Sequence, residues 1–212
     1  MVIENVNPMD IEKRSFEIIE SELNCSLDEK LAPVIKRVIH TTADFDYVEN
    51  LYFSDGVYDK AIAALKSGAT IITDTNMAKA GINKTALSKL GGKVMCFMDD
   101  ADVHERAKEA GTTRATYSMK KAADLESRED ANYIYVVGNA PTALIELNRL
   151  MEEDMVHPAL IIAVPVGFVN VVQAKELIID SGVDCIVARG RKGGSNVAAA
   201  IVNALMYQVT RA

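Results

Sequence analysis

Five short apolar runs, separated by segments with a helical pattern, constrain the fold of this 212-residue chain more than any other feature. The runs are ATIIT (69–73), KVMCF (93–97), YIYVVG (133–138), ALIIAVPVG (159–167) and DCIVARG (184–190). They lack strict alternation, which is typical of strands buried on both faces of a parallel sheet. Amphipathic segments such as 142–155 and 169–180 predict connecting helices. We therefore expect a three-layer α/β/α fold with a mostly parallel sheet.

The N-terminal third of the chain has a helical pattern without such apolar runs. Asn7, which is followed by a proline, predicts the start of a helix over 8–23. Ser26 and Glu29 have the spacing of a capping box, which predicts a second helix that ends near residue 40. We expect this helical segment to pack on the sheet, and not to form a separate domain.

Composition narrows the class of protein. A net charge of −7 argues against a nucleic-acid-binding surface, and no apolar run approaches the roughly 20 residues of a membrane helix. The three cysteines are far apart, which predicts neither a disulfide framework nor a zinc site, and the N-terminal residues lack a signal-peptide pattern. We expect one cytoplasmic domain, residues 1–212, without a metal site and without a nucleic-acid or membrane partner.

The loop after the last apolar run is the most informative candidate site. Ligands of open parallel sheets bind beyond the carboxyl ends of the strands. In RGRKGGSN, glycines let backbone amides point at one ligand, the following helix adds positive potential, and three cations surround it. Such a loop suits phosphate or carboxylate groups, although a solvated basic turn is the alternative. With one residue from the loop after YIYVVG, the expected ligand-binding residues are Asn139, Arg189, Gly190, Arg191, Gly193, Gly194 and Ser195.

Other candidates lie outside this loop. His40 has the side chain best suited to proton transfer near neutral pH, and Arg37 lies about one helical turn earlier, so both could face one cleft. A lone histidine is nevertheless more often structural. Arg114 follows a predicted helix end and could reach an anionic ligand, but a surface arginine is an equally good interpretation. For Ser15, an ordinary helix serine is the default.

Five phrases occur together in this chain: RVIHTTAD, GTTRAT, GNAPTAL, PVGFVNVVQAKE and GRKGGSNVAAAIVNAL. In this order they resemble the precorrin-8X methylmutase family, whose anaerobic-pathway form is cobalt-precorrin-8 methylmutase. The resemblance runs from about Lys13 to the C-terminus. It implies an isomerase of cobalamin biosynthesis that moves a methyl group between adjacent ring carbons of precorrin-8 or cobalt-precorrin-8. The product would be hydrogenobyrinate or its cobalt form.

The resemblance also implies roles for single residues. The family's catalytic histidine falls on His40, which would act as proton donor and acceptor, and its substrate-binding serine and arginine fall on Ser15 and Arg37. No cofactor is expected, because the methyl group never leaves the tetrapyrrole, and any cobalt belongs to the substrate. A homodimer is expected. The chain departs from its relatives at Thr41 and Thr42, where small residues such as Ala-Cys are common.

Some positions and alternatives stay open on the sequence alone. Asp44 and Asp46 could orient the His40 ring or raise its pKa, but their role stays open, and Asp74 and Thr75 receive no role. A corrinoid-binding carrier without catalysis is one alternative function. A nucleotide-binding α/β protein that uses the 190–195 loop is another, although the standard phosphate-binding motifs are absent.

Overall fold

A computed structural model describes residues 3–129 and 131–211, so residues 1–2, 130 and 212 of the expected 1–212 domain lie outside the described residues. The described chain forms one six-stranded sheet in the order β1-β6-β5-β4-β2-β3. Its strands are β1 (Leu51–Phe53), β2 (Thr70–Thr73), β3 (Lys93–Met95), β4 (Tyr133–Val137), β5 (Leu160–Ala163) and β6 (Cys185–Ala188). Neighbouring strands are parallel apart from β1, which pairs antiparallel with β6. The expected mostly parallel sheet is confirmed.

The central strands are buried on both faces, as their continuous apolar runs predicted. Every residue of β4, β5 and β6 is buried. Because side chains alternate along a strand, Val136 and Ile162 pack into the core on one face, whereas Tyr135 and Ile161 pack into the core on the other. Two hydrophobic cores therefore lie on the two sides of one sheet.

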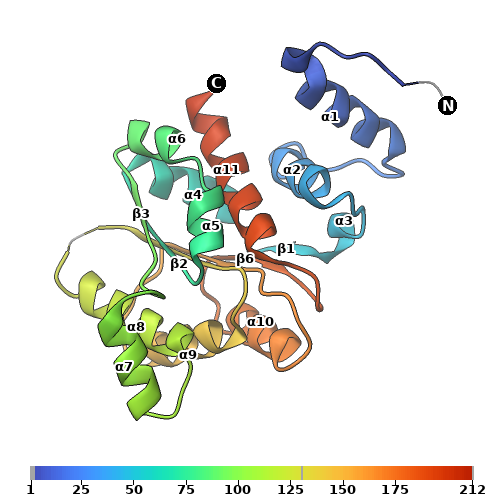
Figure 1. Ribbon diagram of the computed structural model, residues 1–212. Coiled ribbons are helices and arrows are strands. Elements are labelled where there is room, and N and C mark those ends of the chain that lie inside the picture. The colour runs from blue at the N-terminus through green and yellow to red at the C-terminus, as the bar shows by residue number, and fades with distance from the viewer. Residues whose placement is uncertain (1–2, 130, 212) are drawn as a thin grey trace.

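Helices cover both faces and complete the three layers (Figure 1). One layer contains α2 (Ala32–Thr42), α4 (Val57–Lys66), α5 (Asn76–Gly81), α6 (Lys84–Lys89) and α11 (Ser195–Thr210). The other contains α7 (Ala101–Glu109), α8 (Arg114–Glu126), α9 (Pro141–Glu152) and α10 (Val171–Asp180). The short helix α3 (Tyr47–Asn50) leads into β1. None of the helices in the described part of the chain is long and apolar enough to cross a membrane.

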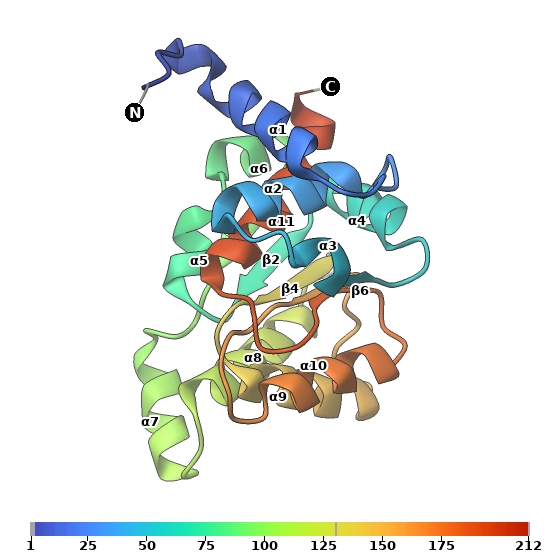
Figure 2. The same ribbon diagram turned by 90° about the vertical axis from the view of Figure 1, so that its right-hand side faces the viewer.

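The N-terminal segment lies outermost, on the side of α2 that faces away from the sheet (Figures 1 and 2). It comprises a 3-10 turn, η1 (Pro8–Asp10), and α1 (Ile11–Glu22). The predicted cap is confirmed, since the Asn7 side chain accepts a hydrogen bond from the Met9 amide at 3.0 Å.

The predicted capping box at Ser26 and Glu29 is wrong, because the second helix begins only at Ala32. The Asp28 carboxylate instead accepts the amides of Lys30 and Leu31, at 2.9 and 3.1 Å, and closes a turn before the helix. A proline in the first turn of α2 is tolerated there, because the first helical amides have no partner within the helix.

Candidate active site

Asp74 joins two loops at the carboxyl edge of the sheet. It follows β2, and its side chain is fully buried. The carboxylate accepts the backbone amides of Gly138 and Asn139 at 2.8 Å each, and of Ala140 at 2.7 Å. Burial raises the pKa of the Asp74 carboxyl, and the three amide donors act in the opposite direction. Asp74 thereby fixes the backbone at Asn139, whose side chain remains exposed.

The glycine-rich loop after β6 packs closely against the loop after β5. The Gly194 amide donates to the Val164 carbonyl at 2.8 Å. A Cβ atom at Gly193 would lie 2.1 Å from the same carbonyl oxygen, so a larger residue there would force the two loops apart. Gly190 has φ +73°, a left-handed conformation that favours glycine. The glycines therefore permit close backbone contact as well as a turn.

Ser195 connects this loop to the rest of the carboxyl edge. It is the first residue of α11, and its hydroxyl lies 2.8 Å from the hydroxyl of Thr75, which caps α5. A Cβ atom at Gly138 would lie 2.8 Å from the Ser195 Cα atom. The loops after β2, β4, β5 and β6 therefore meet at one place, as expected for a ligand site in a parallel sheet.

The three cations of the glycine-rich loop have different environments. Lys192 bonds to the carboxylates of Asp44 and Asp46 at 2.6 Å each, which raises the pKa of Lys192. Arg189 lies 3.5 Å from Glu176 in a weak ion pair. Arg191 is exposed and has no ion pair among residues 3–129 and 131–211. Arg191 is therefore the loop cation most available to an anionic ligand.

A fourth cation, Lys175 on α10, supports the loop from within. Its side chain is fully buried, and its amine donates to the carbonyls of Gly190 and Lys192 at 2.9 and 2.8 Å. Burial lowers the pKa of Lys175 to about 8. Sequence reasoning missed this residue, although a lysine at an apolar-face position of an amphipathic helix was an available signal.

The expected catalytic residue, His40, and two expected substrate-binding residues, Ser15 and Arg37, lie on α1 and α2. His40 is exposed in the last turn of α2, and its ring centroid lies 5.4 Å from that of Phe16 on α1. The Arg37 guanidinium carbon lies 4.8 Å from the Phe16 ring centroid, and Arg37 also bonds to Glu12. That hydrogen bond lowers the pKa of the Glu12 carboxyl. The Ser15 hydroxyl donates to the Ile11 carbonyl at 2.9 Å.

Asp44 and Lys192 link this group to the carboxyl edge. Helix α2 ends at Thr42, and Ala43 adopts a left-handed conformation with φ 54° that turns the chain away. Asp44 follows directly and bonds to Lys192 in the glycine-rich loop. The last turn of α2, with His40, is thus tied to the start of the loop that precedes α11. Asp44 therefore has a structural role that the sequence left open.

Arg114 is not joined to His40 by any contact among residues 3–129 and 131–211. It begins α8, in the layer opposite α2, where its guanidinium donates to the Met98 carbonyl at 3.3 Å. The neighbouring Thr113 hydroxyl lies 2.8 Å from that of Thr142, at the start of α9. Arg114 therefore lies at the same edge of the sheet but in a different cluster.

These features define the class of protein. It is an α/β protein with a mostly parallel sheet, and its glycine-rich loop lies at the carboxyl edge. Lys192 ties this loop to the end of a helix that carries an exposed histidine. Comparison with known proteins narrows this class. A family model described as precorrin-8X methylmutase matches residues 10–208. The chain is 42% identical to the cobalt-precorrin-8 methylmutase of Salmonella typhimurium, over 97% of each chain.

Two further relatives give the same result. The cobalt-precorrin-8 methylmutase of Priestia megaterium is 40% identical, over 94% of this chain and 88% of that protein. The crystal structure of precorrin-8X methyl mutase from Thermus thermophilus is similar with a TM-score of 0.86 and 34% identity, over 95% of this chain and 98% of that one. The chain belongs to the precorrin-8X methylmutase family and is an isomerase of cobalamin biosynthesis. The family resemblance of the five sequence phrases is confirmed.

Proposed function

We propose that this enzyme moves a methyl group between adjacent ring carbons of precorrin-8, or of its cobalt complex, and that His40 is the proton donor and acceptor. The relatives named above act on these compounds. The observation that carries the assignment to His40 is its position. It is an exposed histidine on a helix end that Lys192 ties to the glycine-rich loop.

The surroundings of His40 suit a residue that acts first as general acid and then as general base. Protonation makes the conjugated macrocycle electron-poor, which lowers the barrier to methyl migration, and the proton returns to the imidazole afterwards. His40 lies in the last turn of α2, where the helix dipole places partial negative charge, and the Glu12 carboxylate of α1 bonds to Arg37 one turn earlier. Both supply negative potential near the position where the imidazolium forms.

The cations of the site suit a ligand with many carboxylates. We propose that Arg37, Arg114, Arg189 and Arg191 bind acetate and propionate groups of the tetrapyrrole, because a guanidinium can bind a carboxylate through two hydrogen bonds. Ser15, Asn139 and the backbone of Gly190, Gly193, Gly194 and Ser195 complete the proposed contacts. For Arg37 this requires an exchange, since its guanidinium bonds to Glu12 in the free protein.

We also propose that the enzyme needs no cofactor, because the methyl group stays within one molecule, and that any cobalt arrives with the substrate. A cytoplasmic homodimer is part of the proposal. Exposed apolar side chains of the N-terminal segment support the dimer: Met9 is 88% exposed and Ile11 is 52% exposed. Such side chains on an outermost segment are typical of a protein interface.

The test is to add purified protein to precorrin-8 and follow the spectral change of product formation. We expect His40→Ala to lower kcat at least about 100-fold, the usual contribution of general acid–base catalysis, while the Kd for hydrogenobyrinate changes less than threefold. His157→Ala, an exposed residue just before the amino end of β5, is the matched control and should retain full activity. If His40→Ala rearranges the substrate at the wild-type rate, His40 is not the proton donor. If the wild-type protein binds the product without any turnover, the carrier alternative is correct.

A further inference from the structure

The loop between β5 and α10 exposes apolar side chains at the carboxyl edge. Val166 is 48% exposed, Phe168 80% and Val169 77%. Three such side chains within four residues leave an apolar surface in contact with water, which is unfavourable unless something covers it. The same loop lies against the glycine-rich loop, so the apolar surface adjoins the proposed ligand site.

The exposure of Phe168 is built into the fold. The Gly167 amide donates to the Arg191 carbonyl at 3.2 Å, on one side of Phe168. On the other side, Asn170 adopts a left-handed conformation with φ 58° immediately before α10. The bond from Gly167 to Arg191 holds the backbone next to Phe168 against the glycine-rich loop, so the exposed ring lies beside that loop.

A cation accompanies the apolar surface. The Arg191 guanidinium carbon lies 5.3 Å from the centroid of the Phe168 ring, within the range of a cation–π interaction. Arg191 has no carboxylate partner in the described ranges 3–129 and 131–211, whereas its neighbour Lys192 has two. The guanidinium beside the Phe168 ring therefore keeps its charge available to an anionic group. Together the two side chains offer an apolar surface with a cation at its margin.

We propose that Val166, Phe168 and Val169 form a platform for the flat face of the tetrapyrrole, with Arg191 bound to a carboxylate at its rim. The ligand's chemistry matches both parts, since a macrocycle is apolar across its face and its acidic side chains lie around its edge. The identity of the ligand rests on the proposed function. The existence of the platform rests on the exposure, the backbone contacts and the charge described above.

The probe is metal-free hydrogenobyrinate, whose binding is followed by its absorption spectrum. We expect Phe168→Ala to raise Kd about tenfold, the size of effect expected for an aromatic contact at the centre of a binding surface. Phe168→Tyr keeps the ring and should restore affinity to within twofold. Ile145→Ala, which truncates a 41% exposed apolar side chain on α9, is the matched control and should leave Kd unchanged.

Arg191→Met separates the two parts of the platform. It should raise Kd about tenfold and lower the dependence of Kd on salt concentration, because it removes a charge and keeps an apolar side chain. If Phe168→Ala and Arg191→Met both leave Kd unchanged, the platform proposal is wrong. The proposal also fails if Phe168→Ala leaves Kd unchanged and converts a dimer to monomers in sedimentation, since a second copy of the chain would then cover the surface.

Failure of the platform can be distinguished from failure of the proposed function. Binding of hydrogenobyrinate requires no catalysis, so its Kd can be measured in His40→Ala as well as in the wild-type protein. Loss of affinity in Phe168→Ala, together with absent turnover of precorrin-8 in the wild-type protein, would keep the platform and overturn the proposed reaction. Normal turnover in the wild-type protein, together with unchanged affinity in Phe168→Ala, would keep the proposed reaction and overturn the platform.

Discussion

Two cation-rich regions of this acidic chain differ in what their cations do. One is a groove of 540 Å³ between α7, α8 and α9, whose lining includes Arg106, Lys120, Lys121, Arg128 and Arg149. The other is the glycine-rich loop, with Arg189, Arg191 and Lys192. By number of cations the groove is the better anion site. Within the described ranges 3–129 and 131–211, Arg106 and Arg128 of the groove and Arg191 of the loop have no ion pair. The loop differs in its position, because it lies at the carboxyl edge of the parallel sheet, where ligands bind. A count of basic residues therefore does not locate a ligand site.

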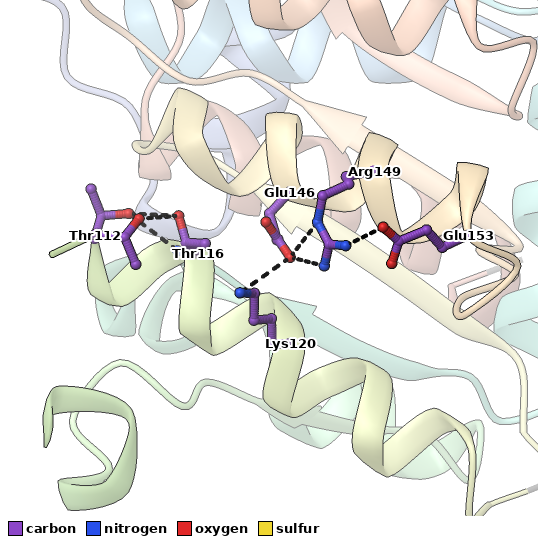
Figure 3. A network of polar contacts seen from close by, with 7 residues as sticks. Thr112, Thr116, Lys120, Glu146, Arg149 and Glu153 are labelled. Atoms are coloured by element: carbon purple, nitrogen blue, oxygen red, sulfur yellow. Dashed lines mark hydrogen bonds and ion pairs between the residues drawn. The ribbon is translucent and has the colours of Figure 1, made fainter. Parts of the chain in front are cut away.

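Two cations of the groove, Arg149 and Lys120, lie against the carboxylate of Glu146 (Figure 3). The Arg149 guanidinium bonds to Glu146 at 2.6 Å and also to Glu153, while the Lys120 amine lies 4.0 Å from Glu146. The side chain of Glu146 is only 9% exposed, so it needs these partners. Lys121 bonds to two further carboxylates, Asp100 and Asp102. These contacts hold α8 to α9 and α7, so these paired charges stabilise the fold.

Lys175→Met tests whether burial beneath the glycine-rich loop lowers the pKa of the Lys175 amine. Lys175 has a folded-state pKa of about 8 against an ordinary value of 10.5, so between these pH values the unfolded chain binds more protons than the folded protein. The wild-type free energy of unfolding should therefore rise through this interval relative to that of Lys175→Met. The expected rise is about 3 kcal/mol, from 1.36 kcal/mol per pKa unit. Urea unfolding at pH 7, 8, 9 and 10 measures it.

The control for this measurement is Lys89→Met, which removes an exposed lysine on α6. Its stability difference from the wild-type protein should not change with pH. A flat difference for Lys175→Met as well would mean that the buried amine titrates as it does in water. In that case burial would not be what tunes this residue.

Arg149→Met tests whether this arginine of the groove stabilises the fold and does not bind the ligand. It leaves the nearly buried Glu146 with only the distant Lys120 amine, so we expect a loss of about 1 to 2 kcal/mol in the free energy of unfolding. The Kd for hydrogenobyrinate should not change. Arg106→Met, from the same groove, is the control and should cost less than about 0.5 kcal/mol, because Arg106 has no ion pair within the described ranges. A rise in Kd for Arg149→Met would show that the groove binds the ligand.

The sequence predicted the sheet better than it predicted the contacts between loops. Continuous apolar runs reveal burial on both faces, so β2 to β6 were all expected. The edge strand β1 was missed, because Leu51–Phe53 is short and its pairing with β6 depends on a residue more than a hundred positions away. Edge strands of this kind carry little periodicity to detect.

The site shows the same division. His40 and the glycine-rich loop stand out by residue type, and family phrases cover both. The roles of Asp74 and Lys175 could not be predicted in the same way, because each bonds to backbone atoms that only the folded topology brings near. For Lys192, the residue type suggested a ligand contact and did not reveal its partners. It was counted among the cations around a ligand, yet its amine is occupied by two carboxylates on another segment.

Lys192→Met has the smallest expected effect and tests whether the bonds from Lys192 to Asp44 and Asp46 position His40. If Lys192 ties the end of α2 to the loop, its removal lets His40 shift relative to the bound macrocycle. We then expect kcat to fall about threefold with little change in KM, since misplacement of a catalytic group mainly affects the chemical step. Salt weakens exposed ion pairs, so the ratio of wild-type to variant rates should approach one at high salt.

The partner variant Asp44→Asn decides between a tie and a ligand contact. A tie can be broken from either side, so Asp44→Asn should lower kcat in the same way as Lys192→Met. A direct contact with substrate predicts different results for the two variants. Asp44→Asn would then release the Lys192 amine from one carboxylate and lower KM, while Lys192→Met would raise it. The two variants should therefore change kcat and KM in the same way if Lys192 ties α2 to the loop. They should change KM in opposite directions if Lys192 contacts the ligand.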